Sequence, residues 1–309
     1  MLKHLEPGIR ELVDGFIQAG RPCASKLTVE ERRVGYLSTV NLAGAGPVMF
    51  EEFEETLDGI TVKVFRPSAD ASLPVTVYFH GGCFVSGGFD THTQQLRYLA
   101  RQTNTLVICI RYRLAPEHPY PAAHDDVYRG VLAIQSQGRR LGADTTKMVF
   151  VGDSAGGHLA LVTSLRLKNS HASLPLIQVL LYPMLDPKGQ SQSYTDNGQD
   201  YIITAQMLLS GFQQYIPGCE AVDGYSELYP LERNDYAGLP PTHIVTAEFD
   251  PLRDEGETLY KRLLESGVSA SCERYLGVIH GFHQLAAVSP SAVRCLDQVA
   301  ACIRRSVVA

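Results

Sequence analysis

The sequence lacks the features that mark membrane-spanning and disulfide-bonded secreted proteins. It has no apolar run long enough to cross a bilayer, no N-x-S/T sequon and no block of five or more like charges. Its seven cysteines are scattered and form no C-x-x-C pair. We therefore expect reduced thiols, no zinc site and a cytoplasmic location away from membranes.

The sequence also lacks a basic surplus, low-complexity tracts and internal repeats. The formal net charge of −6 argues against nucleic acid and anionic membranes as main partners. The opening segment, "MLKHLEPGIRELVDGF", has no apolar core region or cleavage site. It predicts an amphipathic helix and not a signal peptide.

What the chain does contain is enough apolar sequence for one large α/β domain or two small ones. It has 309 residues, of which 45% are apolar. Short apolar runs alternate with helical patterns, which is typical of a mostly parallel sheet covered by helices on both faces. The expected strands are residues 59–67, 73–79, 106–112, 147–152, 176–184, 241–250 and 270–278.

Two segments depart from this alternation. Residues 1–45 look helical throughout, and "LTVEERRVGYLSTV" carries a Thr28–Glu31 capping-box pattern. Residues 188–232 interrupt the later part of the sheet with a helical pattern and Tyr-rich polar flanks. We expect both segments to form a helical cap, or lid, over a catalytic domain made of residues 46–187 and 233–309.

A serine occupies the junction between an expected strand and an expected helix. "VFVGDSAGGHLAL" places Ser154 between Gly152 and Gly156 in a G-x-S-x-G pattern. This pattern forms a tight turn that lifts the serine hydroxyl out of the sheet. The lysine and spacing of a phosphate-binding loop are missing. Ser154 is therefore our candidate nucleophile.

Candidates for the other two members of a catalytic triad follow later strands. A nucleophilic serine needs a base, and the base needs an orienting carboxylate. Asp250 ends one strand, whereas Asp254 and Glu255 compete from the next helix, whose first turn favours acidic residues. Among ten histidines, His280 alone follows a late strand and comes after Asp250, as the order Ser, Asp, His requires.

A glycine-rich loop follows the strand that ends at Phe79. "YFHGGCFVSGG" contains Gly81 and Gly82, with Cys83 interrupting the glycines. Glycine lets a backbone approach a ligand closely, and the N–H groups of such a loop can stabilise an oxyanion. Since positive φ is unfavourable for a non-glycine residue, we expect Cys83 to have a negative φ.

Taken together, these motifs resemble the hormone-sensitive-lipase-like branch of the α/β-hydrolase esterases. The resemblance is carried by "HGGCF", "YRLAPEHPYPAAHDD", "GDSAGGHLA", "DPLRDEG" and "HGF", in that order. It implies an α/β-hydrolase fold with a helical cap, and a Ser154–His280–Asp250 triad. It also implies an oxyanion hole in the Gly81–Gly82–Cys83 loop, with the N–H groups of Gly82, residue 83 and Ala155 as donors.

The resemblance implies a serine carboxylesterase that needs no cofactor or metal. Its substrates would be small-molecule esters with short to medium acyl chains. An amide deacetylase using the same triad and a non-catalytic binding relative of the fold are the alternatives, although relatives of the second kind lack the catalytic histidine. The departure from the family pattern is Cys83, where glycine is usual.

Two further expectations concern the cap and the sheet edge. The acyl pocket should be lined by apolar cap residues, for which we select Tyr201, Ile202, Met207 and Phe212. The strand at residues 270–278 is a candidate edge strand, through which two copies could pair in a homodimer.

Overall fold

A single eight-stranded sheet runs through the part of the chain described by this computed structural model, namely residues 4–20, 22–216 and 227–308. The strand order is β1-β2-β4-β3-β5-β6-β7-β8. The β1–β2 and β2–β4 pairs are antiparallel, and the remaining pairs are parallel. The strands are β1 Glu51–Leu57, β2 Ile60–Arg66, β3 Leu73–Phe79, β4 Leu106–Ile110, β5 Ala143–Asp153, β6 Gln178–Leu181, β7 Thr242–Phe249 and β8 Ala270–Ile279.

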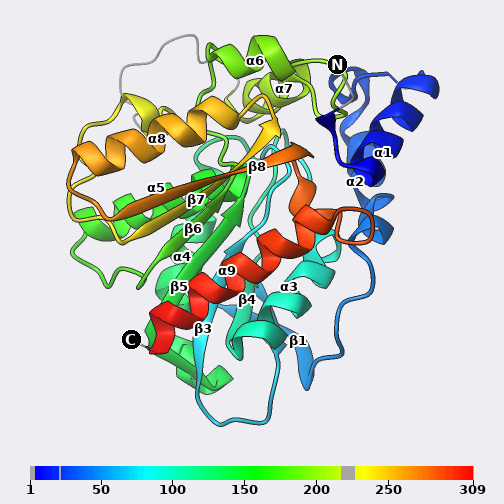
Figure 1. Cartoon of the computed structure of the whole chain (residues 1–309). Helices are drawn as coiled ribbons and strands as arrows, with labels where there is room; N and C mark the ends of the chain where they lie inside the picture. Colours follow the sequence, from blue (N-terminus) through cyan, green and yellow to red (C-terminus); the bar gives the residue numbers. More distant parts are fainter. Residues whose placement is uncertain (1–3, 21, 217–226, 309) are drawn as a thin grey trace.

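Helices connect the strands and cover the sheet (Figure 1). The α-helices are α1 Pro7–Gln18, α2 Val29–Leu37, α3 Phe89–Thr103, α4 Ala122–Gln137, α5 Ala155–Asn169, α6 Gln192–Asn197, α7 Ala205–Tyr215, α8 Arg253–Glu265 and α9 Pro290–Val308. The 3-10 helices are η2 Ala24–Lys26, η3 Val40–Ala43, η4 Gly138–Leu141, η5 Pro230–Glu232 and η6 Phe282–Gln284. None of the described helices combines the length and apolar character needed to cross a membrane.

Two apolar cores lie on the two faces of the sheet. Within β5, Phe150 packs in the core shared with α4, α5 and α8, whereas its neighbours Val149 and Val151 pack in the core shared with α3 and α9. Successive side chains of a strand point to opposite faces. Strands buried on both faces therefore read as continuous apolar runs, and the predicted helix-covered parallel sheet is confirmed.

Helix α2 and the segment around Cys23 contact the segment inserted between β6 and β7. The predicted capping box starts α2: the Thr28 side chain accepts from the Glu31 N–H at 3.2 Å. From the same helix, Arg32 donates to Ser210 Oγ of α7 at 3.1 Å. Cys23 Sγ lies 3.0 Å from Thr204 Oγ1, just before α7. Helix α1 packs elsewhere, against β8: the Glu6 N–H just before α1 donates to the Gly277 carbonyl of β8 at 2.8 Å.

The strand content differs from the sequence analysis at the N-terminal edge. β1, whose sequence is "EEFEETL", pairs with β2 and is the edge strand there. The other edge of the sheet is β8, which in the described residues pairs with β7 alone. This agrees with the expectation that residues 270–278 form an edge strand. The six described cysteines are free thiols, and Cys219 lies outside the described residues.

Candidate active site

The turn between β5 and α5 presents Ser154 in a strained conformation. Ser154 has φ 54° and ψ −120°, a region that side chains other than glycine seldom adopt. A Cβ at Gly152 would collide with the Gly156 carbonyl oxygen, and one at Gly156 with the Phe79 carbonyl oxygen. Both glycines are therefore required by the close approach of backbone segments. The G-x-S-x-G pattern thus forms the tight turn that the sequence predicts.

Three side chains from three separate loops meet at this turn. His280 Nε2 lies 3.1 Å from Ser154 Oγ, and His280 Nδ1 lies 2.8 Å from Asp250 Oδ2. All three residues are buried. An ionised carboxylate only accepts hydrogen bonds, so the proton on His280 lies on Nδ1 and the lone pair of Nε2 faces the serine hydroxyl. This arrangement can take a proton from Ser154.

The loop that carries Asp250 is fixed by neighbours that the sequence did not single out. Asp250 Oδ1 accepts from the Leu252 N–H at 2.8 Å, and the Asn197 side chain donates to the Asp250 carbonyl at 3.2 Å. The competing carboxylate Asp254 accepts from the Ser193 N–H at 2.8 Å and does not contact His280. Glu255 Oε2 accepts the N–H groups of residues 185 and 186. Among the three candidates, only Asp250 contacts His280.

The glycine-rich loop lies against the nucleophile turn through Asp153. The Gly81 N–H donates to Asp153 Oδ1 at 3.0 Å, so that group is already occupied. Within the described residues, the N–H groups of Gly82, Cys83 and Ala155 have no recorded acceptor. Of the four residues selected for the oxyanion hole, Gly81 therefore differs in being unable to offer its own N–H.

The expectation of a negative φ at Cys83 is wrong. Cys83 has φ 55° and the next residue, Phe84, has φ 62°. Local preference opposes this conformation, so contacts from elsewhere must hold it. Cys83 is buried, and its Cβ would lie 2.6 Å from a Cβ added at Gly211 of α7. Helix α7 thus packs directly on the loop.

The four residues selected for an acyl pocket do not form one cluster. Phe212 packs 5.8 Å from the ring of Phe84, in the core that contains Cys83. Tyr201 stacks 5.1 Å from the ring of Phe249 in the other core, and Ile202 packs against that second core. Met207 contributes a carbonyl oxygen that accepts from Arg32.

A cavity of about 480 Å³ opens on another side of the glycine-rich loop. Ser154 does not line it, nor do the four selected cap residues. It therefore gives no support to the pocket assignment. Its walls are Arg33, Leu37, His80, Gly87, Gly88, Phe89, Asp90, Thr91, Arg111, Tyr112, Leu114, Glu117 and His118.

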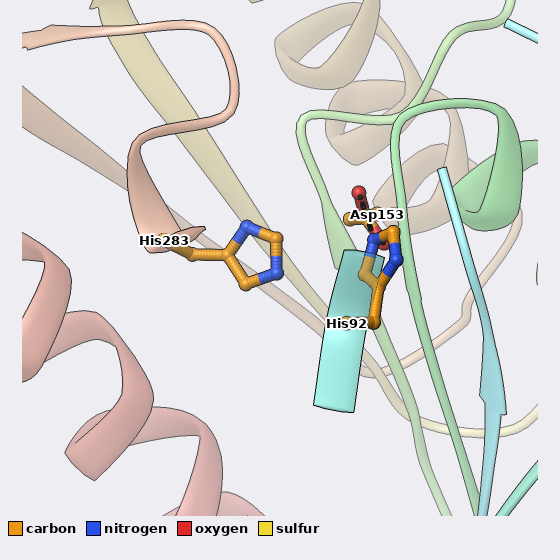
Figure 2. Close-up of side chains that lie close together, drawn as sticks. All are labelled: His92, Asp153 and His283. Atoms are coloured by element: carbon orange, nitrogen blue, oxygen red, sulfur yellow. Dashed lines mark hydrogen bonds and ion pairs between the residues drawn. The ribbon is translucent and has the colours of Figure 1, made fainter. Parts of the chain in front are cut away.

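Beneath the nucleophile turn, three buried polar side chains lie close together. Figure 2 shows the ring of His283 directed toward the pair formed by His92 and Asp153. The closest His92–Asp153 contact is 3.2 Å, between Nε2 and Oδ1. Burial alone would raise the pKa of Asp153, but the electrostatic effect and hydrogen bond of His92 hold it below its usual range.

These three side chains could each offer one ligand atom to a metal ion, within 4.8 Å of one another. Hydrogen bonds among buried side chains also account for the close approach of these candidate ligand atoms. Tyr78 donates to Asp153 Oδ1 at 2.9 Å, so its oxygen can accept from His283 Nε2 at 3.1 Å. His283 Nδ1 then accepts from the Tyr182 hydroxyl. Each proton has one acceptor, and we interpret the cluster as a hydrogen-bonded network.

This network was not predicted, although part of its signal is present in the sequence. His283 follows His280 by one turn, and burial lowers its pKa to about 4. Asp153 directly precedes the candidate nucleophile. Tyr78 and Tyr182 look like ordinary strand residues, and only the assembled sheet shows that their hydroxyls converge.

Comparison with known proteins identifies the family to which the fold belongs. A family model described as "alpha/beta hydrolase fold" matches residues 76–284. The chain is 33% identical over 286 residues to Carboxylesterase NlhH of Mycobacterium tuberculosis, covering 91% of this chain and 83% of the relative. It is 31% identical over 290 residues to an ethyl acetate hydrolase of Pseudomonas putida, covering 88% and 90%.

A solved structure shows the same similarity across nearly the whole chain. The hyperthermophilic esterase from the archaeon Pyrobaculum calidifontis superposes with a TM-score of 0.92 at 32% identity. The match covers 99% of this chain and 100% of that protein. The similarity therefore extends beyond the residues around Ser154 to the whole architecture.

Proposed function

This chain belongs to the hormone-sensitive-lipase-like esterases of the α/β-hydrolase superfamily and is a carboxylic ester hydrolase, and from this premise we propose that Ser154, His280 and Asp250 form its catalytic triad. The observation that carries the proposal is the continuous contact from Ser154 Oγ to His280 Nε2 and from His280 Nδ1 to Asp250 Oδ2. The domain division into residues 46–187 and 233–309, with a cap from residues 1–45 and 188–232, is part of the same proposal.

The geometry supports a two-step acyl transfer. Ser154 Oγ attacks the ester carbonyl carbon while His280 Nε2 takes the hydroxyl proton. The tetrahedral intermediate collapses, the ester C–O bond breaks, and His280 returns the proton to the departing alcohol. Water then attacks the acyl-enzyme carbonyl carbon while His280 takes its proton; the bond between Ser154 Oγ and the acyl carbon breaks, the acid leaves, and His280 returns the proton to Ser154 Oγ. Asp250 orients the imidazole and stabilises its charged form.

We further propose that the N–H groups of Gly82, Cys83 and Ala155 stabilise the oxyanion. They come from the glycine-rich loop and from the first residue of α5, where the helix dipole also favours negative charge. Gly81 would contribute indirectly, since its N–H donates to Asp153 and fixes the loop next to Ser154.

The proposed substrates are small esters with short to medium acyl chains, with Tyr201, Ile202, Met207 and Phe212 as candidate pocket residues. Support for small esters comes from the name of the relative that hydrolyses ethyl acetate. Cytoplasmic location and a homodimer paired through β8 remain predictions. The complete Ser–His–Asp contact argues against the non-catalytic alternative, and a panel that includes acetylated amides would separate esterase from deacetylase.

Ser154→Ala tests the proposal. We expect kcat on a chromogenic acetyl ester to fall by about 10⁴-fold or more, because the nucleophile is lost. Covalent labelling by a fluorophosphonate should disappear in the same variant. Circular dichroism should be unchanged.

Ser164→Ala is the matched control. Ser164 is a buried serine of α5 that donates to Gln178 at 2.9 Å. This variant should keep labelling and most of the activity. A Ser154→Ala protein that kept a tenth of the wild-type kcat would refute the assignment.

A further inference from the structure

The tip of the oxyanion loop, residues 83 and 84, adopts a backbone conformation that its own sequence disfavours. Cys83 and Phe84 both have positive φ, 55° and 62°. Two successive left-handed residues other than glycine are uncommon and need support from surrounding structure. The support should therefore be visible in what their side chains contact.

Cys83 is held by helix α7 and by Arg32. Gly211 of α7 approaches so closely that an added Cβ would lie 2.6 Å from Cys83 Cβ and 2.8 Å from the Cys83 carbonyl oxygen. Arg32 is buried and donates to the Met207 carbonyl of α7 at 3.1 Å, and its Nη2 would lie 3.6 Å from the same added Cβ. Cys83 is thus packed tightly against α7 at Gly211, and Arg32 of α2 lies at the same contact.

Phe84 is held by the same helix, one turn further along. Its ring stacks on Tyr215, with centroids 4.4 Å apart and an interplanar angle of 8°. Phe212 packs at 5.8 Å, and the ring of His158 meets the edge of Phe84 at 5.4 Å. Phe84 and Tyr215 are fully buried. The aromatic stack therefore continues from the loop into α7.

Tyr215 is in turn tied to the core of the catalytic domain by a chain of hydrogen bonds. His158 Nδ1 lies 2.9 Å from the Met184 carbonyl, which can only accept, so Nδ1 carries the proton and Nε2 accepts. His124 Nε2, 3.1 Å away, must then donate, and His124 Nδ1 accepts from the Tyr215 hydroxyl at 2.7 Å. Every proton in this chain has a defined acceptor.

We propose that helix α7 is a positioning element of the oxyanion hole, with Gly211, Tyr215 and Arg32 as positioning residues that hold Cys83 and Phe84 in place. This inference rests on the proposed function, because it assigns the Cys83 N–H to the oxyanion. If α7 positions the loop in this way, α7 stays packed on the loop during turnover and does not open as a lid. Disturbing the contact should lower kcat for every acyl length and leave KM nearly unchanged.

Gly211→Ala is the first test. The added methyl group must displace Cys83, so kcat should fall about 10-fold or more on acetyl and hexanoyl esters alike, with KM within about twofold. Gly35→Ala in α2 is the control, because a Cβ there meets nothing within 4 Å. Unchanged kcat in Gly211→Ala, or a change confined to KM of the longer ester, would overturn the inference.

Combining Gly211→Ala with Cys83→Gly removes the collision between the two Cβ atoms, whereas the approach to the carbonyl oxygen of residue 83 at 2.8 Å remains, so the rescue should be partial. The double variant should be at least about threefold faster than Gly211→Ala alone, the sign of direct coupling. A merely destabilising alanine would not be rescued by deleting a buried thiol. A double variant no faster than Gly211→Ala would contradict the contact.

Tyr215→Phe provides a variant that keeps the ring and removes only the hydroxyl. It leaves His124 Nδ1 without its donor, and we expect kcat to fall about threefold or more with KM unchanged. Fluorophosphonate titration should still label one serine per chain in each variant, which separates this inference from the proposed function. Full labelling with wild-type kcat in Tyr215→Phe would remove Tyr215 from the proposal.

Discussion

At the residue scale, the roles of two neighbouring aspartates can be separated. Asp250 contacts the histidine, whereas Asp254 binds the backbone of α6. Asp250→Asn should lower kcat by about 10⁴-fold, because the amide favours the wrong histidine tautomer. Asp254→Asn serves as the control and should change kcat by less than about tenfold. Steady-state kinetics of both variants test the assignment. A larger loss of kcat in Asp254→Asn than in Asp250→Asn would contradict it.

The same scale shows what a sequence can and cannot predict. The convergence of Ser154, Asp250 and His280 was predictable because each follows a buried strand of a recognisable pattern, and parallel strands bring such positions to one edge. The φ of Cys83 was not predictable, because its local preference is overridden by Gly211 and Arg32, which come from distant segments. The convergence of Tyr78, His283 and Asp153 likewise depends on the assembled sheet.

At the element scale, β1 shows why one strand escaped the pattern analysis. Its sequence is rich in glutamate because it forms an exposed sheet edge, where charges discourage pairing with other chains. Arginines from four different segments pair with these glutamates: Arg66 with Glu51, Arg97 with Glu52, Arg111 with Glu54 and Arg140 with Glu55. Apolar periodicity cannot reveal a strand like β1, because most of its side chains are charged and form ion pairs with arginines elsewhere in the chain.

Asp153 joins four elements, and its carboxylate should matter to all of them. It accepts from the Gly81 N–H and the Tyr78 hydroxyl, and pairs with His92. Asp153→Asn would turn an amide group toward one of these donors. We expect the free energy of unfolding to fall by about 2 kcal/mol. We also expect kcat to fall about 10- to 100-fold, since the glycine-rich loop, our proposed source of oxyanion donors, loses its anchor.

Asp144→Asn, on the same strand, is the control for Asp153→Asn. Among the described residues, Asp144 accepts only from Thr146 nearby in the chain, so stability and kcat should stay close to wild type. Urea unfolding and steady-state kinetics of both variants provide the measurement. Equal behaviour of the two variants would show that Asp153 has no such anchoring role.

At the scale of the whole molecule, buried neutral histidines should make folding sensitive to mild acid. Burial lowers the pKa of His80 to about 3 and of His158 and His283 to about 4, and lowers that of His124 well below its ordinary value. These four side chains lie in the loops and helices on both sides of the nucleophile turn. Their protonation therefore concerns the packing of the entire catalytic region.

The direction in which stability changes with pH follows from which state, folded or unfolded, binds more protons. Below about pH 6.5 the unfolded chain protonates these histidines while the folded protein does not. The unfolded state then binds more protons, so stability is present above pH 6.5 and is lost as the pH falls toward 4. Each histidine contributes about 1.4 kcal/mol per pH unit within that window. Urea unfolding at pH 7.5, 6.5, 6.0 and 5.5 should show a steadily decreasing free energy of unfolding.

Two variants identify the groups responsible for this acid sensitivity. His283→Gln cannot bind the proton, so the slope of stability against pH should decrease by about one proton, whatever its effect on stability itself. His118 is exposed and lies outside the buried set, so His118→Gln is the control and should leave the slope unchanged. A free energy of unfolding that stays level from pH 7.5 to 5.5 in the wild-type protein would mean that these buried histidines do not govern its acid response.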